Sequence, residues 1–455
     1  MAVGMVRLGW SRCRASHSTQ SCEVGAACLV LMLLLAACAA PPRREAPPLD
    51  YRDAAPIGFA RDVMYVDDAH QDSDSNTRRL LWSARQAAMG HPLNVLVLSG
   101  GGAGVAFGAG ALVGWSRTGT RPDFQIVTGV SAGALLAPLA FLGPKWDAAV
   151  TEAFSGATTR DLLQPRWIDA LFGASVYRGK PLVDFVNRYV NDELLRAVAA
   201  ESARGRLLLV ATTDLDHERT VIWDMGRIAA EGGDRGRRLF RDVLVASASA
   251  PGVFPPVLIR VQEAGVEFDE MHVDGGTTVP LFIAPTMAAR TPEEISGLQG
   301  ANVYVIVNGQ LGGPAVTTPL RTVSIVRRGV NAALESSSRA AVEIALSASN
   351  QAGMTLRVSQ IPDAYPYTGW LDTRPAKVAA LFNFGVGCGI RDRLWSSAAH
   401  ALAHNKSSTY ASPAGSPACP ASSVAVSDEG RQVTAAIVQG AATGISAGGL
   451  GVPSP

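Results

Sequence analysis

The stretch Gly129-Val130-Ser131-Ala132-Gly133 decides how this chain of 455 residues is interpreted. It lies between an apolar run over residues 124–128 and a helix-forming run that begins at residue 134. A strand, a sharp G-x-S-x-G turn and a helix together form the setting of a nucleophile elbow, in which the serine hydroxyl points outward. The two glycines leave room for that turn, and the helix directs unpaired N–H groups at Ser131. The alternative is an ordinary turn between a strand and a helix.

The first 37 residues have the composition of a signal peptide. Three arginines precede an apolar core over residues 26–37, which is shorter than the roughly 20 residues needed to cross a bilayer. The core ends in Leu35-Ala36-Ala37-Cys38, which resembles the lipobox of bacterial lipoproteins. This resemblance implies that Cys38 becomes a lipid-modified first residue. The protein would then be anchored to a membrane surface of the bacterial cell envelope, at the outer membrane or facing the periplasm. A plain secretory signal is the alternative.

Charge and cysteine content narrow the classes of partner. Without residues 1–37, the chain has 37 basic and 38 acidic residues, a formal net charge of −1. This balance argues against a nucleic-acid partner, which would require a basic face. No His/Cys cluster has the spacing of a metal site. Cys388 and Cys419 could form a disulfide if Cys38 is lipidated, although Cys419 lies in a segment expected to be mobile.

Composition divides the chain into four parts. Residues 1–37 form the signal peptide, and residues 38–85 form a tether and polar linker. Residues 86–404 alternate between strand-like and helix-like runs, whereas residues 405–455 form a mobile tail rich in Ser, Ala, Gly and Pro. The alternation predicts a three-layer α/β/α fold with a mostly parallel central sheet. The expected helices include residues 78–89, 181–200, 239–249 and 320–350, and the expected strands include residues 94–98, 206–213, 257–261, 266–268, 302–307 and 354–360.

Three loops follow strands and can meet at the sheet edge where open α/β proteins bind ligands. The first, Gly100-Gly101-Gly102, fits neither a dinucleotide loop nor a P-loop, whereas its backbone N–H groups suit an oxyanion hole. The second is Ser131. The third is Asp274-Gly275-Gly276, whose carboxylate is sterically open. An aspartate is a poor base unless its site is desolvated, and the alternative is a turn residue that caps its own backbone.

No downstream histidine is well placed to complete a Ser–His–acid triad. His217 lies in a polar loop, as expected of a surface residue, and His272 lies in an apolar stretch that favours burial or a supporting role. His400 and His404 share a helix face, but a surface pair explains their spacing better than a metal site. An α/β-hydrolase esterase that uses one of these histidines is the first alternative function.

Four blocks of sequence, taken in order, resemble those of patatin-like phospholipases. They are Ser99-Gly100-Gly101-Gly102-Ala103, the elbow, residues 248–256, and Asp274-Gly275-Gly276. The resemblance implies a Ser–Asp dyad, with Ser131 as nucleophile and Asp274 as base, and an oxyanion hole made by the backbone of Gly100 to Gly102. It also implies hydrolysis of lipid or phospholipid esters on a three-layer α/β/α fold, with no metal and no cofactor.

One position departs from that family's pattern. Many members carry Arg or Lys after the glycine block, where this chain has Gly104. A cation there would help to position an anionic head group, so neutral and lysolipid esters remain possible substrates.

A non-catalytic lipoprotein that binds lipid is the second alternative function. Residues that could line an acyl pocket, or else pack in the core, are Phe107, Trp115, Leu135, Leu139, Phe141 and Phe254, and a cover over the site is suggested for Trp167, Phe172 and Tyr177.

Overall fold

The computed structural model of the chain describes residues 43–49, 51, 53–66, 72–158, 175–283, 298–312, 317–403 and 417–421. The expected signal peptide and Cys38 lie outside the described residues, as do His404, Trp167 and Phe172. Within the described ranges, no helix is both long enough and apolar enough to cross a membrane.

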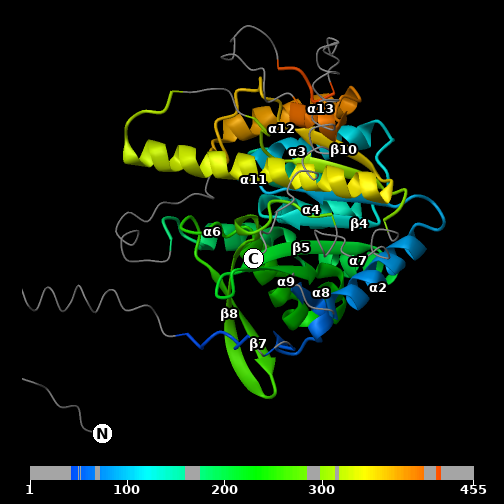
Figure 1. The fold of residues 1–455 in the computed structure, drawn as a ribbon, viewed down its shortest axis with the longest axis vertical. Coiled ribbons are helices and arrows are strands. Elements are labelled where there is room, and N and C mark those ends of the chain that lie inside the picture. Colours follow the sequence, from blue (N-terminus) through cyan, green and yellow to red (C-terminus); the bar gives the residue numbers. More distant parts are fainter. Residues whose placement is uncertain are drawn as a thin grey trace, which may run out of the picture.

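The described residues form an 11-stranded sheet in the order β1-β7-β8-β5-β4-β3-β9-β10-β11, with β6 paired to β5 and β2 paired to β6 (Figure 1). Neighbouring strands are parallel across the centre, from β5 to β10, and antiparallel towards both edges. The expectation of a mostly parallel sheet is therefore confirmed for the core strands. The strands are β1 (Ala55–Pro56), β2 (Met64–Val66), β3 (Asn94–Leu98), β4 (Ile126–Val130), β5 (Leu207–Asp214), β6 (Arg219–Asp224), β7 (Val257–Glu263), β8 (Val266–Asp274), β9 (Asn302–Val307), β10 (Thr355–Gln360) and β11 (Ser396–Ser397).

Helices cover both faces of this sheet because its central strands are apolar on both faces. Side chains alternate along a strand, so Leu96 and Leu98 of β3 join one buried cluster while Val95 and Val97 join the other. This arrangement confirms the α/β/α layers. The helices are α2 (Asp72–Ala87), α3 (Val105–Arg117), α4 (Ala132–Leu142), α5 (Asp147–Phe154), α6 (Lys180–Tyr189), α7 (Asp192–Ala203), α8 (Met225–Glu231), α9 (Gly233–Ser247), α11 (Thr322–Ala352), α12 (Pro375–Ile390) and α13 (Ala398–Ala403).

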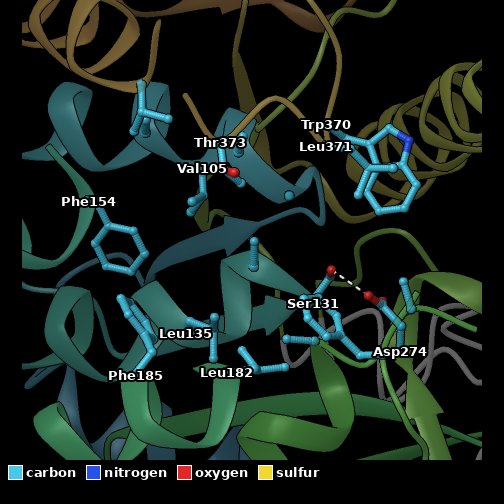
Figure 2. A pocket seen from close by; sticks show the side chains of 18 of the residues that line it. Val105, Ser131, Leu135, Phe154, Leu182, Phe185, Asp274, Trp370, Leu371 and Thr373 are labelled. Atoms are coloured by element: carbon cyan, nitrogen blue, oxygen red, sulfur yellow. Dashed lines mark hydrogen bonds between the residues drawn. The ribbon is translucent and has the colours of Figure 1, made fainter. Parts of the chain in front are cut away.

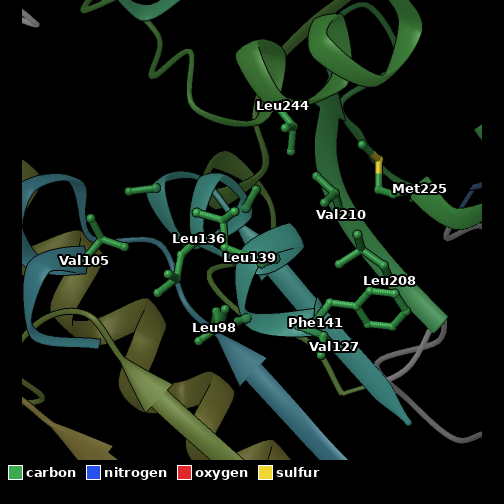
Figure 3. Packing of buried hydrophobic residues seen from close by; sticks show 14 of the residues in the cluster. Leu98, Val105, Val127, Leu136, Leu139, Phe141, Leu208, Val210, Met225 and Leu244 are labelled. Atoms are coloured by element: carbon green, nitrogen blue, oxygen red, sulfur yellow. The ribbon is translucent and has the colours of Figure 1, made fainter. Parts of the chain in front are cut away.

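Helix α4, which follows the elbow, is apolar on nearly every side. Its Leu136 and Phe141 are fully buried, and Leu139 is 2% exposed. Figure 3 shows these side chains packed beside β3, β4 and β5. A helix enclosed in this way has little freedom to shift, so it fixes the position of the serine at its N-terminus.

The N-terminal boundary of the domain differs from the expected tether and linker over residues 38–85. The described part of that range contains β1, which pairs with β7, and β2, which pairs with β6. It also contains α2, which begins at Asp72 rather than at residue 78. Leu80, Leu81 and Ala84 of α2 are buried against the sheet. The sequence did not predict the first turns of α2, because they are polar and the apolar residues of this helix lie in its second half.

Two further expectations are corrected. Residues 181–200 form two helices rather than one, because the chain breaks at Val190 and the Asn191 side chain caps α7 by accepting a hydrogen bond from the Leu194 N–H at 2.9 Å. The described part of the tail, residues 417–421, is fixed to the domain. Cys419 is joined to Cys388 of α12 by a disulfide, so the pairing left open by the sequence is present.

Candidate active site

Ser131 occupies the sharp turn between β4 and α4. Its backbone has φ of 56° and ψ of −131°, a conformation that non-glycine residues rarely adopt. The flanking glycines are required by close packing. A Cβ on Gly133 would lie 2.5 Å from the Ser99 carbonyl oxygen, and a Cβ on Gly129 would lie 2.8 Å from the Ala134 Cα. This packing draws α4 against β3. The strained turn at Ser131 is the one that the elbow motif predicts.

Hydrogen bonds hold Ser131 at both its hydroxyl and its backbone. The Oγ donates to Asp274 Oδ2 at 2.6 Å, and the N–H donates to Ser247 Oγ at 3.0 Å. Ser247 in turn donates to the Ala211 carbonyl at 2.7 Å, which ties the elbow to β5. Sequence reasoning missed Ser247, since a buried serine near the end of an amphipathic helix carries no distinctive signal.

Asp274 is the last residue of β8, and β8 runs antiparallel to β5. Its Oδ1 accepts the Gly276 N–H at 2.7 Å, so it both caps its own turn and binds Ser131. The side chain is nearly buried, with 7% of the residue exposed. Burial raises the pKa of Asp274 to about 7, against the lowering effect of the hydrogen bonds from Ser131 and Gly276. The desolvation that a basic aspartate needs is therefore present.

The glycine loop lies against Ser131, since a Cβ on Gly100 would be 3.1 Å from the Ser131 Cβ. The Gly100 N–H donates to the Pro280 carbonyl at 3.1 Å, which removes Gly100 from the expected oxyanion donors. Neither the Gly101 nor the Gly102 N–H has an acceptor among the described residues. Ala132, at the start of α4, adds an N–H of the kind that helix termini leave unpaired. These donors suit a developing negative charge beside Ser131.

A pocket opens beside Ser131 and Asp274. Figure 2 shows Ser131 and Asp274 on one side of it and Phe154 and Phe185 on the other. Apart from the dyad and Thr373, its lining is apolar. Of the suggested acyl-pocket residues, Leu135 and Phe254 line this pocket, Leu139 lines a smaller neighbouring cavity, and Phe107, Trp115 and Phe141 belong to the buried core.

Part of the chain is similar to a known protein family. Residues 96–285 match the patatin-like phospholipase family model. At this general level, the patatin-like match supports lipid acyl hydrolase activity. No curated protein shows significant similarity to the sequence. Among solved structures, VipD from Legionella pneumophila is similar at 11% identity, covering 66% of this chain and 67% of that chain, with a TM-score of 0.29. A TM-score of this size does not bear on the site.

Residues C-terminal to the segment that the family model matches contact the glycine loop. The Ala103 N–H donates to the Trp370 carbonyl at 2.8 Å, and Tyr367 Oη donates to the Gly101 carbonyl at 3.3 Å. A Cβ on Gly104 would lie 2.0 Å from the Asn308 carbonyl oxygen and 2.8 Å from Tyr367 Oη. The departure at Gly104 thus has a steric reason, because the space that a basic side chain would need is filled. No sequence signal marked these partners.

His217 and His272 hydrogen-bond to groups other than Ser131 and Asp274. His272 is fully buried, as expected, and its ring contacts Thr212 Oγ1 at 3.0 Å and Glu270 Oε2 at 3.1 Å. His217 differs from the expected surface residue, because its side chain is only 8% exposed and hydrogen-bonds to Asp214 Oδ2 at 2.5 Å. The polar turn folds back onto buried Asp214, which explains the difference. In the described part of the chain, no cluster of His, Cys, Asp and Glu could hold a metal ion.

Proposed function

We propose that this chain is a serine acyl hydrolase that cleaves lipid esters with the Ser131–Asp274 dyad. The observation that carries the proposal is the 2.6 Å hydrogen bond between Ser131 Oγ and Asp274 Oδ2 at the wall of an apolar pocket. A serine hydroxyl is a weak nucleophile, so it needs an adjacent base to take its proton. Since burial raises the pKa of Asp274 to about 7, its carboxylate is a far stronger base than an exposed aspartate.

The reaction would proceed in two stages. Ser131 Oγ attacks the ester carbonyl carbon while its proton passes to Asp274 Oδ2, and the N–H groups of Gly101, Gly102 and Ala132 stabilise the oxyanion. The intermediate expels the alcohol, which takes the proton from Asp274, and leaves an acyl-serine. Water then loses a proton to Asp274 and attacks the acyl carbon, and the fatty acid departs as Ser131 is reprotonated. The apolar pocket favours the acyl chain as the part of the substrate that is buried.

Covalent labelling tests this proposal. We expect a fluorophosphonate probe to modify the mature protein at Ser131 and the Ser131→Ala variant to remain unlabelled. Ser349→Ala is the matched control, because Ser349 is a buried helical serine in α11 whose hydroxyl donates to the Ala345 carbonyl of its own helix at 2.7 Å. Mass spectrometry of lipids incubated with wild type and Ser131→Ala should identify the ester consumed. A folded wild-type protein that is not labelled would favour the alternative of lipid binding without catalysis.

The proposal includes attachment to the cell envelope through Cys38. The Cys388–Cys419 disulfide supports a compartment outside the reducing cytosol. We expect the wild-type protein to sediment with bacterial membranes and Cys38→Ala to be released or to accumulate unprocessed. Peptide mass spectrometry should find a diacylated or triacylated N-terminal Cys38. A mature N-terminus at any other residue would contradict the anchor without affecting the proposed chemistry.

A further inference from the structure

A second, much smaller cavity adjoins the pocket that holds Ser131 and Asp274. Four residues line both spaces, namely Leu135, Ala153, Phe154 and Phe185. The rest of the second cavity is formed by Leu139, Val186, Tyr189, Val190 and Leu244. The two cavities are therefore neighbours that share these four residues in their walls.

The spacing of residues on α4 sets the order of the two cavities. Ser131, Leu135 and Leu139 are four residues apart and so lie along one side of the helix. Ser131 lines only the first cavity, Leu135 lines both, and Leu139 lines only the second. At about 1.5 Å per residue, Leu139 is about 12 Å along the helix from Ser131. An acyl chain that extends from the serine along α4 would reach the second cavity end-on.

Phe154 and Phe185 form the partition. Their rings meet edge to face, with centroids 5.9 Å apart, and Phe185 also packs on Tyr189 at 5.2 Å. In Figure 2 both rings lie at the end of the pocket away from Asp274. Phe154 is 4% exposed and held in α5, whereas Phe185 on α6 is only half-buried. Phe185 therefore has more room to turn aside than Phe154.

From this arrangement we infer that the second cavity binds the far end of a long acyl chain and that Phe185 limits the length of chain that is accepted. The inference rests on the proposed function, since it takes Ser131 as the point where the chain is attached. Short chains occupy the first pocket alone. Long chains reach the second cavity only by displacing the Phe185 ring, which must give up its contact with Phe154.

The test is the ratio of kcat/KM for a p-nitrophenyl palmitate ester to that for a butyrate ester. Each additional methylene removed from water changes kcat/KM by about fourfold, so admission of two more should raise this ratio by roughly 15-fold in Phe185→Ala. Phe185→Leu, which retains apolar packing, should raise it less, and Phe185→Trp should lower it. Phe59→Ala is the control, since Phe59 is a half-buried phenylalanine that lines neither cavity.

A binding measurement separates this inference from the proposed function. In the Ser131→Ala background, Phe185→Ala should bind palmitate roughly 15-fold more tightly and leave the affinity for butyrate unchanged. If that shift occurs in a protein whose wild type hydrolyses neither ester, the second cavity is supported and the proposed function fails. If the wild type is active but both the kinetic ratio and the palmitate affinity are unchanged in Phe185→Ala, then Phe185 does not limit the length of the acyl chain. The proposed function would stand in that case.

Discussion

Asp274→Asn is expected to lower kcat by roughly 10³-fold, the middle of the range for loss of a positioned general base. The asparagine amide can keep the contact with Ser131 Oγ but cannot accept its proton. The wild-type enzyme should lose activity in acid for the same reason. Since burial raises the pKa of Asp274 to about 7, kcat/KM should fall about tenfold per pH unit below pH 7 and level off above it.

The same substitution should stabilise the fold at neutral and alkaline pH. The pKa of Asp274 is about 7 in the folded protein, against about 3.9 in an unfolded chain. A raised pKa means that the stability from this group is fully present below about pH 4 and is lost as the pH rises through 7. The asparagine side chain of the variant would carry no charge to desolvate. The free energy of unfolding of Asp274→Asn should therefore exceed that of wild type by up to about 4 kcal/mol at pH 8 and by much less at pH 4.

Asp242→Asn provides the matched control for both effects. Burial raises the pKa of Asp242 on α9 to about 6, but this residue does not line the pocket. Its replacement should leave kcat unchanged while the pH dependence of unfolding becomes weaker. Denaturant unfolding at pH 4 and pH 8, with kcat measured on the same preparations, checks all three proteins. Wild-type turnover by Asp274→Asn would exclude the Ser–Asp dyad.

Ser131 and Asp274 could be predicted from sequence because each is defined by its immediate neighbours. The elbow needs a strand, two small residues and a helix, all within one short stretch, and Asp274 ends a strand before two glycines. Only the contact between these two residues depends on the fold. It depends on β8 pairing with β5 in a register that places Asp274 opposite Thr212, one strand away from the elbow. The order of the four blocks of sequence was enough to predict that contact.

The residues that hold the site in place could not be predicted in this way, because they lie far from it in the sequence. Ser247, Asn308 and Trp370 contact the elbow or the glycine loop through backbone and short polar groups. Contacts of this kind impose no periodicity and require no particular residue type at the distant position. Likewise, the polar start of α2 and the break between α6 and α7 were misread, because local composition did not show which residues would be buried.

Gly104→Arg, which supplies the basic residue usual in patatin-like proteins, is expected to impair this protein. The added Cβ would lie 2.0 Å from the Asn308 carbonyl oxygen, so the glycine loop or the Asn308 backbone must move. Overpacking of this kind lowers the free energy of unfolding by about 1–3 kcal/mol. Movement of the loop also displaces the Gly101 and Gly102 N–H groups, and loss of an oxyanion donor lowers kcat by about 10²–10³-fold. Ester kinetics and thermal unfolding measure the two effects.

Two further variants separate crowding from charge. Gly104→Ala adds the same Cβ without a cation, so it should reproduce most of the loss in kcat. Gly309→Ala is the matched control, because a Cβ at this neighbour of Asn308 meets nothing within 4 Å and its φ is not left-handed. No change of the Asn308 side chain should rescue Gly104→Arg, since the obstacle is a backbone carbonyl. Faster hydrolysis of anionic phospholipids by Gly104→Arg would show instead that the loop tolerates the side chain, and that absence of the cation determines the choice of substrate.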